Sequence, residues 1–384
     1  MITGVPDFQW HAGCFGTASG NMMAFWDRNG LPNFYTGPTG NGVAPLNSAG
    51  INSGIRALWA SKAGLDGRPA NRPGHIDDYW TTGNESMDAL YESTARDPYV
   101  VEKRTEHAPD CLSDFMGSSQ NKWADFDGEC SGNINAFSFN YWDKTGALRT
   151  NFVPPVLGGN QVRDVQSGLR EWTRWRGYEA EVASQLVDFN PEVPVGQGFT
   201  FENLKDEILR GNPVMLILQN PGEYSRNLSG MPRANPNIHA MVAFRYQVTD
   251  DGYEVVQFRT SWGSGDVAES WSSWTSQVWA AQLDLRGVVL YRPLPKVNSI
   301  ERLQGKLTIR WDGPSSTLWD GVNEVEIPAY EYSVESSTSL DGPFTQIGEL
   351  TTSRELTVDD PGANHIFFRV KLTHPAYDAH HASL

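Results

Sequence analysis

Two residues far apart in the sequence, Cys14 and His239, could together carry out nucleophilic catalysis. Cys14 directly precedes a stretch in which apolar residues recur at helical spacing from Phe15 to Phe25, so its sulfur is expected at the N-terminus of a helix. The partial positive charge there and an adjacent imidazolium would each lower the pKa of the thiol. The sequence therefore predicts a cysteine nucleophile whose general base is a histidine brought close by the fold.

His239 is favoured over the other histidines because it opens the first strand of a predicted hairpin. Two β-prone runs flank Asp250-Asp251-Gly252, a strong turn signal. Antiparallel pairing about this turn would place His239 opposite residues 262–264, next to the segment Thr260-Ser261-Trp262-Gly263. This segment can supply the group that a catalytic histidine needs on its second ring nitrogen, and the Trp262 side chain could shield that hydrogen bond from water. The alternative is a histidine satisfied within the core.

The segments around these residues resemble a known family. Val5-Pro6-Asp7-Phe8 through Gly13-Cys14, followed by Thr17-Ala18 and the ending Phe25-Trp26-Asp27-Arg28-Asn29-Gly30, is similar to bacterial C39-like peptidases of the papain-like superfamily. His239-Ala240-Met241-Val242 resembles the strand that carries the catalytic histidine, and Trp262-Gly263 the pair that follows the orienting Asn. The segments 75–80 and 114–117 are also similar, so the resemblance covers about residues 4–292.

This resemblance implies a cysteine endopeptidase that acts on protein or peptide substrates through an acyl-enzyme thioester, with no cofactor and no metal. Gln9 would donate to the oxyanion together with the Cys14 backbone N–H, next to Gly13. Thr260, followed by Ser261, stands where the family carries Asn or Asp, and its hydroxyl could accept a hydrogen bond from the imidazole. Asp266 could take over this orienting role if the loop folds back.

Two alternatives keep the same residues but change the function. A Cys-His pair also serves amidases, isopeptidases and transglutaminase-like acyl transferases. A decayed pseudopeptidase, with Thr260 in place of the orienting residue, would act only as a binding or adhesion protein.

Composition limits the class of protein. The 384 residues carry a formal charge of −16, which argues against nucleic acid or an anionic membrane surface as partner. No run of about 18 apolar residues predicts a membrane span. We expect an exported, monomeric protein whose signal peptide is absent from this sequence, a cytoplasmic one being the alternative. Three cysteines then indicate a disulfide between Cys111 and Cys130 that leaves Cys14 free, unless all three are reduced.

The order of helical and strand patterns predicts that an α+β domain at residues 1–293 positions the site. Helical patterns precede strand patterns, and residues 64–139 indicate long loops with short helices. The alternate acidic residues at 125–129 could bind calcium, but the bidentate Glu that closes an EF-hand loop is missing, so we do not predict a metal site there. The expected helices are 15–26, 49–63, 162–172 and 204–209, and the expected strands are 214–218, 240–248, 253–260 and 287–291.

Residues 294–384 predict a small β-sandwich after Pro293-Leu294-Pro295. Trp311 and the strand Phe367-Phe368-Arg369-Val370 resemble those of fibronectin type III modules, which usually space or tether. The histidines at 374, 380 and 381 are expected in solvent. The predicted strands are 306–311, 330–336, 344–347, 354–358 and 365–373.

Overall fold

The computed structural model describes most of the chain outside several long segments. The helix expected at 49–63 lies almost wholly outside the described residues, as do Gln9, Trp262, Asp266, Cys130 and the acidic stretch 125–129. The described residues are 1–8, 13–34, 43–46, 58, 61, 63–64, 69–75, 107–117, 156–157, 160–161, 163–219, 238–261, 269–275, 283–319, 326–363 and 365–383.

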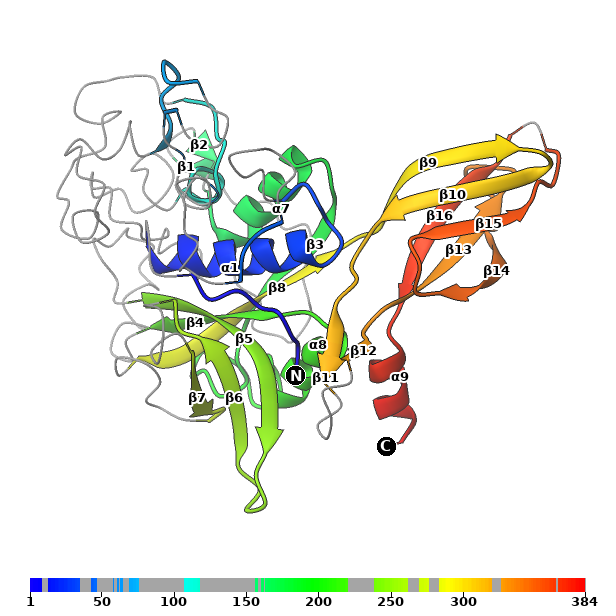
Figure 1. The fold of residues 1–384 in the computed structure, drawn as a ribbon. Helices are drawn as coiled ribbons and strands as arrows, with labels where there is room; N and C mark the ends of the chain where they lie inside the picture. Colours follow the sequence, from blue (N-terminus) through cyan, green and yellow to red (C-terminus); the bar gives the residue numbers. More distant parts are fainter. Residues whose placement is uncertain are drawn as a thin grey trace.

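A six-stranded antiparallel sheet forms the centre of the first part of the chain (Figure 1). Its strands, in spatial order, are β3 (Ala180–Leu186), β8 (Asp284–Pro293), β4 (Val214–Gln219), β5 (Ile238–Val248), β6 (Glu254–Arg259) and β7 (Glu269–Ser273). Every residue of β4 is buried, which explains its uninterrupted apolar sequence. The short strands β1 (Val156–Leu157) and β2 (Asn160–Gln161) form a separate pair. The α+β class predicted from the sequence is confirmed.

Three described helices pack on this sheet, and a fourth packs on two of them. The central helix α1 lies against β4 and β5, and it is buried from Cys14 to Asp27. The short helix α6 contacts both α1 and α7, while α7 also packs on β3 and α8 packs on β4 and β5. The bounds are α1 (Cys14–Arg28), α6 (Leu112–Met116), α7 (Val165–Trp175) and α8 (Phe201–Leu209). None of the described helices has both the length and the apolarity that crossing a bilayer requires.

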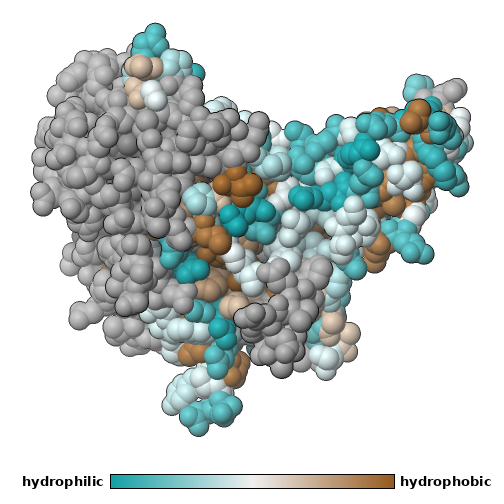
Figure 2. All heavy atoms as spheres, in the orientation of Figure 1, coloured by the Kyte–Doolittle hydropathy of each residue, from teal (hydrophilic) through white to brown (hydrophobic). Residues whose placement is uncertain are grey.

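The C-terminal residues form a second lobe made of two three-stranded sheets (Figure 1). One sheet has the order β15 (Glu355–Asp359), β10 (Lys306–Asp312) and β9 (Lys296–Leu303). The other has the order β14 (Thr345–Thr351), β13 (Glu331–Ser337) and β16 (Phe367–Thr373). Its small core contains Leu307, Ile309, Trp311, Tyr332 and Val334. The chain leaves the large sheet at Pro293 and enters this lobe at Lys296, while the lobe surface in Figure 2 is mainly hydrophilic.

The two lobes are joined by more than the chain connection. The pair β11 (Thr317–Trp319) and β12 (Glu326–Pro328) reaches the N-terminus, where Ile2 bridges to Leu318. The backbone N–H of Gly313 donates to Gly30 O at 3.1 Å. A Cβ on Gly30 would lie 1.8 Å from the carbonyl oxygen of Gly313, so only glycine at position 30 allows the two backbones to come this close.

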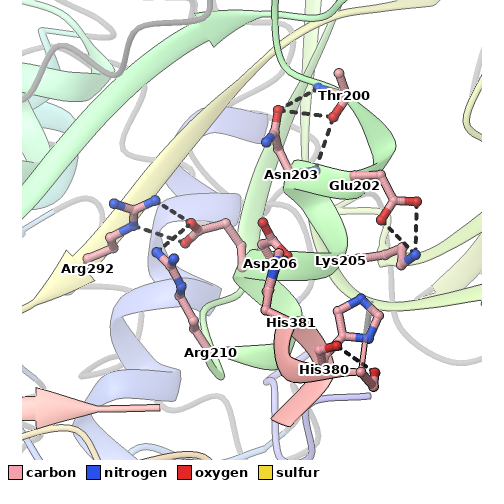
Figure 3. A network of polar contacts seen from close by, with 11 residues as sticks. Thr200, Glu202, Asn203, Lys205, Asp206, Arg210, Arg292, His380 and His381 are labelled. Carbon is pink, nitrogen blue, oxygen red and sulfur yellow. Dashed lines mark hydrogen bonds and ion pairs between the residues drawn. The ribbon is translucent and has the colours of Figure 1, made fainter. Parts of the chain in front are cut away.

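The last helix, α9 (Pro375–Ala382), packs against α8. His381 Nε2 lies 2.8 Å from Asp206 Oδ1 (Figure 3). The Arg210 guanidinium stacks over the Tyr377 ring at 4.0 Å. His374 is half-buried, and burial lowers its pKa to about 4. The expectation that these C-terminal histidines are all in solvent is therefore wrong for His374, whereas His381 is exposed and pairs with Asp206 at the surface.

Candidate functional site

The N-terminus of α1 places Cys14 at the first helical position. Gly13 precedes it with φ 94° and ψ 153°, a region open almost only to glycine. Its carbonyl accepts hydrogen bonds from the Thr17 backbone N–H at 3.1 Å and from the Thr17 hydroxyl at 3.0 Å. The first N–H groups of the helix have no partner within it, and those of Cys14 and Phe15 point at the Cys14 sulfur.

Strand β5 lies against this sulfur. Cys14 Sγ is 3.9 Å from the carbonyl oxygen of Ile238, and the backbone N–H of Ala240 also faces it. These two groups flank His239, so the helix and the strand bring the cysteine to the backbone on both sides of the histidine. The sulfur of Cys14 therefore contacts the β5 backbone next to His239, 225 positions later in the sequence.

His239 is buried, and its ring is fixed by a backbone group. It pairs with Leu218 of β4 in the sheet, and its Nε2 lies 2.6 Å from the carbonyl oxygen of Thr260. A carbonyl oxygen can only accept, so Nε2 carries the proton and the neutral ring has its basic lone pair on Nδ1. The hydrogen-bond acceptor for the imidazole, which was expected to be the Thr260 hydroxyl, is therefore the Thr260 main-chain carbonyl.

The end of the β5–β6 ladder explains how that carbonyl reaches the ring. In the described residues the ladder stops at the pair Val242 and Arg259, after a register shift between Ala243 and Arg245. Ser261 then takes φ 58°, a left-handed conformation that is uncommon for a residue with a Cβ. The chain therefore turns directly after Thr260, whose carbonyl points at His239 instead of pairing with a strand.

Burial dominates the electrostatics of both groups. It raises the pKa of the Cys14 thiol from 9.0 to about 11, against the opposing effect of the N–H groups of Ala240, Phe15 and Cys14. It lowers the pKa of His239 from 6.5 to about 4, although the Thr260 carbonyl favours the protonated ring. Both groups are neutral at pH 7. The expectation of a thiol pKa lowered by the helix N-terminus is wrong, because desolvation outweighs the backbone dipoles.

The second described cysteine is also a free thiol. Cys111 is fully buried and forms the N-cap of α6, whereas Cys130, its predicted disulfide partner, lies outside the described residues. Its sulfur lies within 4.8 Å of donor atoms of His75 and Asp114. Cys111 faces a polar cluster inside the protein, which the polar stretch between the two cysteines did not reveal.

Sequence reasoning missed this cluster. His75 Nδ1 lies 2.5 Å from Asp114 Oδ1, and His107 Nε2 lies 2.9 Å from Asp114 Oδ2. The Asp110 backbone N–H donates to the same Oδ2 at 3.1 Å. The available signal was the spacing of His107, Asp110 and Asp114 at intervals of three and four residues, just before and within α6.

Comparison with known proteins gives no relative for this chain. No protein-family model matches it, and a search of curated proteins returns no similar sequence. The functional argument is therefore made from the geometry of Cys14, His239 and Thr260.

Proposed function

We propose that this protein is a cysteine endopeptidase of the papain-like class, with Cys14 as nucleophile and His239 as general base. One observation carries the proposal: Cys14 Sγ lies 3.9 Å from Ile238 O, directly beside a buried histidine whose Nε2 is held at 2.6 Å by Thr260 O. A nucleophile, a base and a group that orients the base form the minimum set for acyl transfer through a covalent intermediate.

The chemistry follows from this tautomer. His239 Nδ1 takes the thiol proton as the sulfur attacks the carbonyl carbon of the scissile bond, which gives a tetrahedral oxyanion. The Cys14 backbone N–H at the helix N-terminus turns from the sulfur to donate to that oxyanion, and Gln9 is the second donor by the family resemblance. The imidazolium then protonates the leaving amine as the C–N bond breaks, and water activated by His239 hydrolyses the thioester.

The neutral resting state determines when the proton moves. With both groups buried and uncharged, a separated thiolate and imidazolium would be costly before substrate binds. We therefore assign proton transfer to the attack step, in which the Thr260 carbonyl stabilises the charge that develops on the ring.

A second candidate is a pseudopeptidase that binds protein without cleaving it. The raised pKa of Cys14 favours this candidate, because a thiol with a pKa of about 11 is a weak nucleophile on its own. Cleavage that depends on Cys14 separates the two functions.

The test uses the wild-type protein and a peptide library, with products read by mass spectrometry. We expect new carboxyl termini, and we expect cleavage to disappear after alkylation by iodoacetamide at alkaline pH, with the adduct mapped to Cys14. An added amine separates hydrolysis from acyl transfer, since a transferase would form amides instead of acids. Cleavage that persists after complete alkylation of Cys14 would contradict the assignment of Cys14 as the nucleophile.

Replacing Thr260 with valine is expected to change kcat/KM by less than about 5-fold. Valine keeps the shape and the main-chain carbonyl and removes only the hydroxyl, and the carbonyl is the group that holds His239 Nε2. Steady-state kinetics of Thr260→Val beside the wild type check this. A loss of about 100-fold, the size expected when an orienting group is removed, would mean that the hydroxyl orients the ring.

A further inference from the structure

A cluster of metal-ligand side chains lies at the start of α6, apart from Cys14 and His239. One donor atom each from His75, Cys111 and Asp114 lie within 4.8 Å of one another, and all three residues are buried. They come from two segments 36 residues apart in the sequence, which the fold brings together. Nothing in the mechanism proposed above uses them.

From this arrangement we infer that His75, Cys111 and Asp114 supply three of the four ligands of a Zn²⁺ site. A thiolate, an imidazole nitrogen and a carboxylate oxygen are the three ligand types that zinc takes in proteins, whereas calcium and magnesium prefer oxygen donors alone. Binding exchanges protons for the metal: the Cys111 S–H and the His75 Nδ1–H each release H⁺ to solvent, and sulfur and nitrogen then bond to Zn²⁺. No electron is transferred.

The surroundings of Asp114 match those of a metal-bound carboxylate. Its Oδ1 faces His75, while its Oδ2 accepts from His107 Nε2 at 2.9 Å and from the Asp110 backbone N–H at 3.1 Å. Ligating carboxylates are typically held in this way by outer groups that fix their orientation. His107 is thus a positioning residue of the site.

A hydroxyl links the two ligand segments. Ser61 Oγ accepts from the His75 backbone N–H at 2.9 Å and donates to Asp110 Oδ1 at 2.7 Å. The segment that carries His75 is therefore tied to the loop that leads into α6 even before the ligands are considered. Binding an ion replaces the hydrogen bond between His75 Nδ1 and Asp114 Oδ1, because these two atoms must move apart to coordinate the same Zn²⁺.

The role that follows is to hold α6 between two larger helices. Ser19 Oγ of α1 lies 3.2 Å from Met116 Sδ, and a Cβ on Gly168 of α7 would lie 2.6 Å from the Met116 backbone. An ion at the N-terminal end of α6 would join this short helix to the segment that carries His75, and α6 in turn packs on α1, whose first residue is Cys14. The site thus stabilises the scaffold and does not take part in proton transfer.

The test measures metal binding directly, without relying on activity. We expect the purified full-length protein to contain stoichiometric zinc by mass spectrometry of its metals, and its melting temperature to fall with EDTA and recover with added Zn²⁺. Loading with Co²⁺ instead should give the near-ultraviolet absorption of a thiolate-cobalt bond. Cys111→Ser should lose this absorption, and the matched control Cys14→Ser should keep it.

A third variant keeps the inference testable if Cys111→Ser fails to fold. His107→Gln retains all three ligands, so it should keep the cobalt absorption but bind Zn²⁺ about 10- to 100-fold more weakly. Wild-type protein that is free of zinc, shows no cobalt absorption and melts at the same temperature with EDTA would make the cluster a hydrogen-bond network only. Absorption lost in Cys14→Ser and kept in Cys111→Ser would place the metal on the other thiol and overturn the inference.

Discussion

Replacing His239 with alanine is expected to lower kcat/KM at pH 7 by about 10³- to 10⁴-fold, and replacing Cys14 with alanine to abolish cleavage. A thiol with a pKa of about 11 is ionised in only about one molecule in 10⁴ at pH 7. Without the imidazole to accept its proton, the enzyme depends on that small fraction. The expected loss also matches what general bases contribute in other enzymes.

The pH dependence of the His239→Ala variant separates a chemical role from a structural one. If the variant works through pre-ionised thiolate, its residual rate should rise about 10-fold per pH unit until the pH approaches the thiol pKa of about 11. The wild type should show no such rise. Steady-state kinetics on one peptide between pH 7 and 10 measure both. A residual rate that stays flat with pH would mean that His239 supports the fold and not the proton transfer.

A double variant and a distant histidine provide the controls. Cys14→Ala with His239→Ala should be no less active than Cys14→Ala alone, because residues that act as one unit are not additive. His374→Ala removes a half-buried histidine, whose pKa is also lowered to about 4, from the contact with Tyr330 and should leave kcat/KM unchanged. Cleavage that survives in Cys14→Ala would contradict the assignment whatever the other variants do.

The elements that hold the site could be predicted because their signals are local. The periodicity that starts at Phe15 predicted a helix that the structure gives as Cys14–Arg28. The turn at Gly252, with φ 81°, joins the two expected strands β5 and β6, and this hairpin identified the Thr260 segment as the neighbour of His239. A turn residue and an alternating pattern contain this information without any tertiary contact.

The chemistry of the site was less predictable because it depends on burial and on single backbone angles. The helix N-terminus at Cys14 indicated a lowered thiol pKa, but the depth of burial that reverses the shift is a property of the whole fold. The role of the Thr260 carbonyl depends on the positive φ of Ser261, and no sequence pattern predicts that angle. Strand β3 was also missed, since its alternation is obscured by Ser184 and Gln185, both of them buried.

In the C-terminal lobe, too, features with a local sequence signal could be predicted and features that depend on distant contacts could not. Strands β10 and β13 to β16 follow alternating patterns and were predicted, whereas β9 was not. The return of α9 to α8 is made by single contacts such as His381 with Asp206. These residues are 175 positions apart, so their pairing has no local signal. The lobe is therefore held against the first part of the chain more firmly than a flexible spacer would be.

The free energy of unfolding is expected to decrease by about 3 kcal/mol between pH 6.5 and pH 4 because of His239 alone. Its pKa is about 4 in the folded protein and near the ordinary 6.5 in the unfolded chain. Between these values the unfolded chain binds the proton and the folded protein does not, so acid favours unfolding. The stabilisation is complete above pH 6.5 and is lost as the pH falls to 4.

His374 contributes in the same direction, since its pKa is also lowered to about 4 by burial. Urea unfolding at pH 7 and pH 4.5 measures the combined effect, and His239→Gln and His374→Gln separate the two sites. Each variant should lose less stability on acidification than the wild type, because glutamine does not titrate. Equal acid sensitivity in His239→Gln and the wild type would mean that His239 binds its proton equally well in both states, and the neutral imidazole required for proton transfer from Cys14 would then lose its physical basis.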